Sequence, residues 1–375
     1  MSLLGRNVCV GAIVALVWGM CGAGVAVAQV GAAYSVVEEG IDAVVVDEAL
    51  GDSPEGIWLE GDVLWFAKRA AEGPWWVSGG VSAELARIGE TDLWVVGLRW
   101  DRWDEAFLTA GFHGTPFPSM DTEFRPWRGE GAPPSPERAE PGLVETFEIA
   151  GPLGVKDRSI TVVLPPGYEG MGTLPALVLA DGQSAEDWGA VVASMVLEGR
   201  CAGFAVIGVH SGGYEGDRSE PYDPKLDVRA CEYLEGFDQA RFDAHLDWVV
   251  DRVLPEVARR YPVSLAREGL GFGGFSNGGA FAASAGLRRG DVFGMSLALS
   301  VGVPPEVGED EEVTARFYFA AGALEPRFLE HTGIARDRVV EGGGEAVFET
   351  FVGGHDPEQW ILALSRFGGA MYPVE

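Results

Sequence analysis

Basic residues are scarce in this chain. Lysine and arginine together number 27 against 57 aspartate and glutamate residues, so the 375 residues carry a formal net charge of −30 at pH 7. Nucleic acids and anionic membrane surfaces bind proteins through basic patches, which makes both poor partners for this chain. Histidine and cysteine are also rare, with five and four residues, and their spacing does not match a metal site. The sequence predicts neither nucleic-acid binding nor a metal centre.

Long apolar runs are missing as well. The longest, at 8–20, is short and is followed by the small residues Ala-Val-Ala at 26–28. This pattern predicts a signal peptide over residues 1–28, export to the periplasm or beyond, and no membrane anchor after cleavage. Cleavage leaves two cysteines, Cys201 and Cys231, which are candidates for a disulfide in an oxidising compartment.

Disorder of the whole chain is excluded, because 47% of the residues are hydrophobic and 10% are aromatic. The length suits two domains. Residues 33–128 contain short aromatic or β-branched segments bounded by Gly, Asp and Glu, which predicts a small all-β sandwich domain. Its clearest strands are expected at 62–68, 75–80, 91–100 and 106–114.

Tryptophan is concentrated in this first region. Seven of the twelve tryptophans fall between Trp58 and Trp103. In a small sandwich such rings are expected in the core or at an interface. A platform on which sugars stack is the alternative.

A proline-rich segment at 129–142 predicts a linker. From 143 to 375 strand and helix patterns alternate, which is typical of an α/β domain with a mostly parallel sheet and helices on both faces. Helices with apolar stripes are expected over 184–199 and over 242–257, the second bent near Pro255. Strands are expected at 158–168, 174–182, 203–212, 292–300, 316–322 and 346–354.

The strongest chemical signal is GFGGFSNGGAFAAS at 271–284, in which residues 274–278 fit G-x-S-x-G. A nucleophilic serine needs a tight strand-to-helix turn that lifts its hydroxyl clear of the sheet, and flanking glycines let the backbone pack closely there. We therefore predict Ser276 as the nucleophile of an acyl transfer. The helix that follows aims its first amides, including that of Asn277, at the developing oxyanion.

A second oxyanion donor is expected from the loop after LVLA. There, Asp181-Gly182-Gln183 stands where hydrolases carry a His-Gly-Gly loop. The backbone amide of Gln183 is the predicted donor. The side chains of Gln183 and Asn277 are not required for this task.

His355 is the best candidate for the general base. It lies in GGHDPEQW at 353–360, on a loop before the last helix and 79 residues after Ser276. A loop histidine preceded by two glycines has no packing duty, and the order nucleophile then histidine is that of α/β-hydrolases. The alternative is a solvated loop histidine without a catalytic role.

The residue that orients His355 is expected in the loop after the strand at 316–322, where Glu325 is the only acid. The alternative for Glu325 is a first-turn glutamate stabilised by the helix dipole. Asp337 and Asp356 are then the substitute acids.

The sequence at this point resembles a known family. Residues of about 145–370 are similar to the esterase D/enterochelin-esterase group, and the stretch before them resembles the β-sandwich that precedes the hydrolase domain in enterochelin esterases. The resemblance implies an α/β-hydrolase domain over 143–375 that cleaves carboxylic esters, with Ser276 as nucleophile and His355 as base. It also implies that Arg218 borders the site and contacts substrate. The matching pieces are DVLWFAKR, RIGETDLWVVGLRW, ITVVLPPGY, LVLADGQ, DRSEPYDP, GFSNGG, FAAGALEP and GGHDPEQW.

The predicted function is hydrolysis of a small-molecule ester through an acyl-enzyme, with no cofactor and no metal. The resemblance points to a siderophore trilactone such as enterochelin, whereas the negative charge of the chain disfavours a strongly anionic substrate. Feruloyl or acetyl esters of carbohydrates, and acyl transfer to a sugar or lipid alcohol, are the alternatives. A non-catalytic binding protein on a hydrolase scaffold is disfavoured by Ser276 and His355.

Overall fold

The computed structural model describes residues 33–38, 40–115, 122–152, 156–216, 223–308 and 312–374. The predicted signal peptide at 1–28 and Arg218 lie outside these ranges. Within them, no helix combines the length and the apolar character that a membrane crossing requires.

The chain forms two compact units. The first comprises the residues up to Pro134 together with two later segments, Gly322–Arg327 and Thr350–Gln359. The second comprises Ser135–Ala321, Phe328–Glu349 and the residues from Trp360 on. The later segments of the first unit carry Glu325 and His355, so both residues group with the N-terminal region of the sequence.

The first unit contains an eight-stranded antiparallel sheet in the order β2-β3-β6-β5-β4-β7-β8, with β1 paired to β6. The four strands expected in this region are confirmed as β3, β4, β6 and β7. The strands are β1 (Ser35–Val36), β2 (Glu55–Glu60), β3 (Val63–Arg69), β4 (Trp75–Gly79), β5 (Ala83–Arg87), β6 (Leu93–Arg99), β7 (Phe107–His113) and β8 (Phe124–Arg128).

β5 joins the two halves of this sheet, because it pairs with β6 along one part and with β4 along another. One core cluster contains Phe66 of β3 and Leu98 of β6 together with Val77 of β4 and Leu108 of β7. The two halves therefore pack against each other around a common core, as alternating strands with one apolar face require.

The tryptophans of this unit are packing residues. Trp103 is buried in the common core, and Trp94 and Trp100 pack against it. Trp58 and Trp65 stack with ring centroids 6.4 Å apart in a second cluster. The interpretation as core rings thus accounts for them, and no stacking platform is needed.

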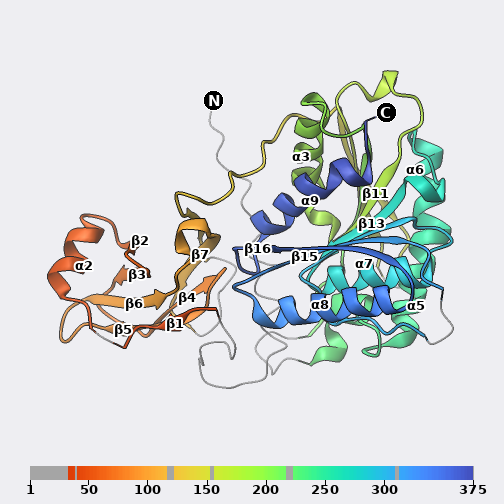
Figure 1. Ribbon diagram of the computed structural model, residues 1–375. Coiled ribbons are helices and arrows are strands. Elements are labelled where there is room, and N and C mark those ends of the chain that lie inside the picture. The colour runs from red at the N-terminus through yellow and green to blue at the C-terminus, as the bar shows by residue number, and fades with distance from the viewer. Residues whose placement is uncertain are drawn as a thin grey trace. The chain divides into compact units, whose positions relative to one another are not determined.

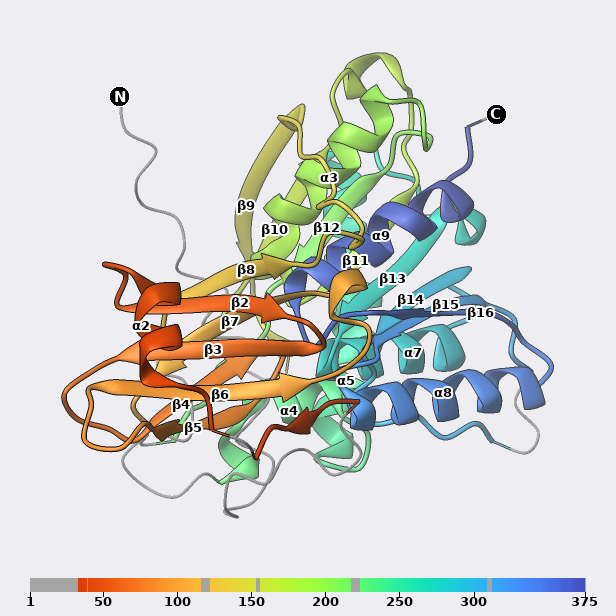
Figure 2. The same ribbon diagram turned by 60° about the vertical axis from the view of Figure 1, so that its left-hand side comes forward.

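A helix that the sequence analysis did not anticipate covers the second cluster. α2 (Ala43–Leu50) begins after Asp42, whose carboxylate accepts from the Val44 amide at 2.8 Å. Val46 and Leu50 of α2 are buried in the same cluster as residues of β3 and β6. Figure 2 shows α2 beside the strands β2, β3 and β6.

The second unit is built on an eight-stranded sheet in the order β16-β15-β14-β13-β11-β12-β10-β9. The pairs from β12 through β11, β13 and β14 to β15 are parallel, while β9 and β10 are antiparallel to their neighbours. The six expected strands are confirmed. The strands are β9 (Leu143–Ile149), β10 (Arg158–Leu164), β11 (Ala176–Ala180), β12 (Ala205–Val209), β13 (Leu270–Phe275), β14 (Met295–Leu299), β15 (Arg316–Gly322) and β16 (Glu345–Phe351).

Helices cover both faces of this sheet, as Figure 1 shows, with α3 and α9 on one face and α7 and α8 on the other. The expected helix over 242–257 is interrupted, because the π-helical segment Val249–Val253 separates α5 from α6 ahead of Pro255. The helices are α3 (Ala185–Leu197), α4 (Val228–Tyr233), α5 (Gln239–Trp248), α6 (Leu254–Arg260), α7 (Asn277–Arg288), α8 (Pro326–Glu341) and α9 (Pro357–Met371).

The strand order reverses direction beside β11. The chain passes from β11 to β12 on one side and then crosses back to β13 on the other side of β11. In open α/β sheets, ligands bind at the carboxyl ends of the strands where such a reversal occurs. The loops after β11 and β13 hold Gln183 and Ser276, so the topology brings the predicted nucleophile and oxyanion loop to this position.

The predicted disulfide is wrong, because Cys201 and Cys231 are both buried free thiols. Cys201 lies four residues before β12, whereas Cys231 lies in α4, whose first residue donates to Gly213 beyond the carboxyl end of that strand. The two thiols are thus on segments that leave β12 at opposite ends. A disulfide requires Cα atoms within about 7 Å.

Candidate active site

Ser276 is the single residue between β13 and α7. Its backbone has φ 59° and ψ −124°, a conformation that residues with a side chain rarely adopt. The Ser276 amide donates to the Leu299 carbonyl and the Ser276 carbonyl accepts from the Gly302 amide, both at 2.9 Å. These bonds fix the turn that the G-x-S-x-G pattern predicts.

The glycines of this turn are required by close backbone packing. A Cβ at Gly274 would collide with the carbonyl oxygen of Gly278, and a Cβ at Gly279 would collide with that of Leu299. A Cβ at Gly278 would lie 2.9 Å from a carboxylate oxygen of Asp181. The elbow is therefore in direct contact with the loop that follows β11.

The Ser276 side chain is fully buried, and its Oγ has no hydrogen-bond partner within the described ranges. Buried hydroxyls usually pair, because leaving one unpaired costs free energy. An unpaired nucleophile hydroxyl is available for a bond formed only during reaction. The burial differs from the open position expected for an elbow serine.

Stacked aromatic rings pack next to the Ser276 turn. Phe275, the last residue of β13, stacks on Trp360 with centroids 4.1 Å apart, and on its other neighbour Trp188 at 6.3 Å. The indole nitrogen of Trp360 donates to Ser300 Oγ at 2.8 Å. Close-packed aromatic rings give the turn a rigid base.

The loop after β11 places the Gln183 amide at the same end of the sheet as Ser276. Gly182 cannot carry a Cβ, which would collide with the backbone of Gly208 and Val209. The Gln183 side chain donates to Ser211 Oγ at 3.0 Å and accepts from the Ser211 amide at 3.3 Å. This side chain anchors the loop, which leaves the backbone amide as the predicted donor.

A buried ion pair beneath this loop was not anticipated from the sequence. Asp181 has φ 55°, and its carboxylate accepts two bonds of 2.7 Å from the Arg229 guanidinium. The Asp181 amide donates to the Tyr233 hydroxyl at 3.0 Å. Bidentate pairs of this kind fix geometry as well as charge. No sequence motif marks Arg229 in LDVRACEY, because its partner is 48 residues away.

Glu325 and His355 are brought together. The His355 Nδ1 lies 2.6 Å from Glu325 Oε2, and the other oxygen of Glu325 accepts from the Gly322 amide at 2.6 Å and from Gln359 Nε2 at 2.7 Å. Glu325 is 2% exposed. This carboxylate is therefore held on both oxygens and can orient the imidazole. Gln359 was missed, although it stands in the same GGHDPEQW motif.

The two substitute acids have other partners. Asp337 lies on α8 and pairs with Arg336 at 2.6 Å. Asp356 is fully buried, and its carboxylate accepts from Thr109 and from the Glu358 amide.

The other four histidines have structural partners. His113 bonds to Ser78 at 2.8 Å, and burial lowers its pKa. His210 bonds to Thr161 at 2.8 Å, and burial lowers its pKa too. His331 bonds to the Gly302 carbonyl at 2.6 Å. His245 is buried among aromatic rings.

Comparisons with known proteins show what this chain is similar to. A family model described as "Putative esterase" matches residues 155–360, which is more than half of the chain. A comparison with curated proteins found no similar sequence.

Solved structures show a related fold along most of the chain. The ferric enterobactin esterase of Salmonella typhimurium has a TM-score of 0.65 at 18% identity, over 88% of this chain and 98% of its own. The Shigella flexneri enterobactin esterase, solved in the presence of enterobactin, has a TM-score of 0.64 at 16% identity, over 86% and 96%. A ferulic acid esterase has a TM-score of 0.50 at 18% identity, over 61% and 97%.

At these identities the solved structures show only that the fold is related. The family model matches the amino-acid sequence itself and therefore shows the family. The matched range contains Gln183, Ser276, Glu325 and His355. The resemblance noted from the sequence is thereby confirmed. The chain belongs to this esterase family and is a carboxylic ester hydrolase.

Proposed function

We propose that this protein is an exported serine esterase that hydrolyses its substrate through an acyl-enzyme on Ser276. The observation that carries the proposal is the Ser276 turn. A non-glycine residue at φ 59° between strand and helix is strained, and its buried Oγ has no partner within the described ranges. Backbone strain and an unpaired buried hydroxyl both lower the stability of the fold. Their presence at one residue is explained if that residue is a nucleophile.

In the proposed reaction, Ser276 Oγ attacks the ester carbonyl carbon while His355 takes the hydroxyl proton. Glu325 orients the imidazole and stabilises its charged form. The backbone amides of Gln183 and Asn277 bind the oxyanion, and one such donor contributes about 10²- to 10³-fold to kcat. His355 then protonates the leaving alcohol, and water hydrolyses the acyl-enzyme.

We further propose that residues 143–375 form an α/β-hydrolase domain. Ser276, Glu325 and His355 follow β13, β15 and β16, and the chain order nucleophile, acid, histidine is that of this fold. The Ala323 amide donates to the Phe351 carbonyl and the Leu324 amide to that of Gly353. The segments that follow β15 and β16 therefore run in the same direction, which supports a parallel pairing of β15 with β16.

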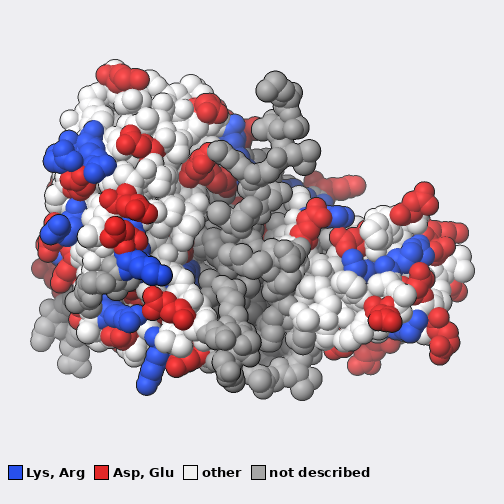
Figure 3. Space-filling model, turned by 180° about the vertical axis from the view of Figure 1, so that it is seen from behind, with Lys and Arg blue, Asp and Glu red and all other residues white. Residues whose placement is uncertain are grey.

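The proposed substrate is a siderophore trilactone. Support comes from coverage, since the enterobactin esterases match the N-terminal region as well, whereas the ferulic acid esterase matches only 61% of the chain. The net charge of −30 opposes an anionic ligand. On the face in Figure 3, acidic residues are interspersed with smaller groups of basic ones. The second candidate is a less charged feruloyl or acetyl ester of a carbohydrate.

The first test is Ser276→Ala beside Ser284→Ala, a buried serine on the α7 helix that follows Ser276. Ser276→Ala should lose turnover and fluorophosphonate labelling, while Ser284→Ala should retain both. Full activity in Ser276→Ala would contradict the serine mechanism. Rates on enterochelin, feruloyl and acetyl-sugar esters then decide the substrate, and a sugar or lipid alcohol added as acceptor detects acyl transfer.

Export is tested separately. Expression of the whole chain in a bacterium, followed by fractionation and N-terminal sequencing, should give a periplasmic or secreted protein that begins at Gln29. A cytoplasmic protein with residues 1–28 retained would contradict it.

A further inference from the structure

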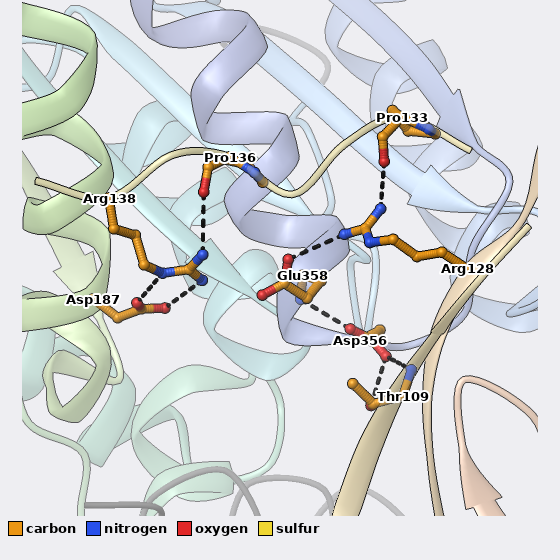
Figure 4. A network of polar contacts seen from close by, with 8 residues as sticks. All are labelled: Thr109, Arg128, Pro133, Pro136, Arg138, Asp187, Asp356 and Glu358. Atoms are coloured by element: carbon orange, nitrogen blue, oxygen red, sulfur yellow. Dashed lines mark hydrogen bonds and ion pairs between the residues drawn. The ribbon is translucent and has the colours of Figure 1, made fainter. Parts of the chain in front are cut away.

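The segment that carries His355 is anchored to the N-terminal sheet of its own unit. Asp356, next to His355, is fully buried, and its Oδ2 accepts from both the amide and the hydroxyl of Thr109, the latter at 2.6 Å. Thr109 lies in the middle of β7, 247 residues earlier in the chain. Figure 4 shows the Asp356 carboxylate directed at Thr109.

The backbone before His355 is attached to the same strand. The Phe107 amide donates to the Val352 carbonyl at 3.0 Å, and Phe107 forms a parallel bridge with Gly353. A Cβ at Gly354 would collide with the backbone of Gly80. Both glycines before His355 therefore lie against the sheet, so β7 contacts the loop before and after His355.

The Asp356 carboxylate is satisfied by donors on two sides. Oδ2 takes the two Thr109 donors, and Oδ1 accepts from the Glu358 amide at 2.9 Å. Burial raises the pKa of Asp356, and the bonds from Thr109 oppose that rise. Moving the loop away from β7 would leave the Asp356 carboxylate buried without its Thr109 donors, which costs free energy. The carboxylate therefore holds the loop and β7 in one geometry.

A second contact on the loop is more peripheral. Arg128 at the end of β8 pairs with Glu358 at 3.3 Å and donates to the Pro133 carbonyl. Both charged side chains are about a quarter exposed. Partly exposed pairs contribute little, so Glu358, in the first turn of α9 directly after this loop, provides a matched control.

We propose that Thr109 and Asp356 are positioning residues for His355, so that the N-terminal β unit sets the geometry of the catalytic base. The inference rests on the proposed function of His355. A displacement of about 1 Å in a catalytic group can cost 10²-fold in rate. A loop between strand and helix needs such outside support, because its own residues do not fix its position.

The test compares four variants of the full mature chain. Asp356→Asn places an NH2 group against the Thr109 or the Glu358 amide whichever way it turns. Thr109→Val removes only the hydroxyl donor, Thr109→Ser restores it, and Glu358→Gln removes only the outer charge. Steady-state kinetics on p-nitrophenyl acetate give kcat and KM, and fluorophosphonate labelling of Ser276 gives a rate that is independent of substrate affinity.

Asp356→Asn and Thr109→Val should lower kcat by about 10- to 100-fold, with KM within threefold and the labelling rate falling in parallel. Thr109→Ser should recover most of kcat, and Glu358→Gln should stay within twofold of wild type. Wild-type kcat in Thr109→Val and Asp356→Asn would overturn the inference, and so would a loss in KM alone or no recovery in Thr109→Ser. If Asp356→Asn does not fold, the Thr109 pair decides.

His355→Ala, measured alongside, distinguishes a failure of the proposed catalytic base from a failure of the positioning role. Retained activity in His355→Ala would refute the proposed function itself. An inactive His355→Ala with fully active Thr109 and Asp356 variants would refute only the positioning role.

Discussion

The Ser276 turn and the His355 loop are built in different ways. The turn is made by consecutive residues, and it rests on packed rings such as Phe275 and Trp360. The loop is held by polar bonds to residues far away in the sequence, among them Glu325, 30 residues away, and Thr109. One half of the proposed site thus depends on backbone geometry, backbone hydrogen bonds and apolar packing, and the other on long-range hydrogen bonds made by side chains.

This difference decides what a substitution can do. A change at the turn must disturb a backbone that has no free space, so it should act on fold and activity together. A change in the loop network removes a bond that orients one side chain, so it should act on rate more than on stability.

The largest effect is expected for His355→Ala. Nucleophile and base act as one unit, so the loss should match that of Ser276→Ala, at about 10⁴-fold or more in kcat. The double variant should be no worse than either single one. Measurement of kcat for all three proteins checks this, and additive losses would show that the residues act independently.

Glu325→Gln should lower kcat by roughly 10²- to 10³-fold, because the amide still fills the space but no longer stabilises a charged imidazole. Asp337→Asn, on the exposed surface of α8, is the control and should be silent. Single-turnover rates at constant pH make the comparison. A silent Glu325→Gln would remove Glu325 as the orienting acid.

Sequence reasoning found the local half of the site and much of the fold. Four strands of the first sheet, six of the second and the helix α3 follow from residue patterns, and the strand-turn-helix around Ser276 follows from G-x-S-x-G, because each depends on neighbouring residues. α2 was missed, since its Asp42 cap stands before a run of valines that indicates a strand. The pairing of Glu325 with His355 was also predicted, because each residue stands in the loop after a predicted strand.

The other long-range contacts could not be predicted from the sequence. Nothing next to Arg229 or Thr109 in the sequence indicates their partners, since the ion pair and the loop anchor form only when the sheets are assembled. The disulfide failed for the same reason, because two cysteines 30 residues apart were paired by compartment alone. Spacing along the chain does not give separation in space.

Gly274→Ala should impair the turn. Its Cβ would collide with the Gly278 carbonyl, and backbone cannot move aside as a flexible side chain can. We expect a loss of about 1–3 kcal/mol in the free energy of unfolding and about 10²-fold in kcat. Gly333→Ala is the matched control, since nothing lies within 4 Å of its Cβ on α8. Urea unfolding should show a lower free energy of unfolding for Gly274→Ala and a higher one for Gly333→Ala, because alanine is favoured over glycine within a helix.

The smallest effect on activity is expected at His245, in the apolar packing of α7, where a substitution acts on stability and only in acid. Phe281 of α7 packs against His245, with ring centroids 5.3 Å apart, and Tyr233 and Trp248 also contact that imidazole. Burial lowers the pKa of His245 to about 3, and the Arg158 charge adds to this. Glu232, paired with Arg158, lies 3.8 Å from Nδ1, and burial raises the pKa of its carboxyl.

His245→Phe should therefore weaken the acid sensitivity of the fold. An unfolded histidine has a pKa of about 6.5, so below that pH the unfolded chain binds a proton that the folded chain excludes. The stability that the neutral ring provides is complete above pH 6.5 and is lost as the pH falls toward 3. At pH 4.5 the loss is roughly 2–3 kcal/mol. Urea unfolding at pH 7.5 and 4.5 measures the free energy of unfolding, which should fall by that much less in the variant than in wild type. Equal falls in both proteins would mean that His245 does not cause the acid sensitivity of the fold.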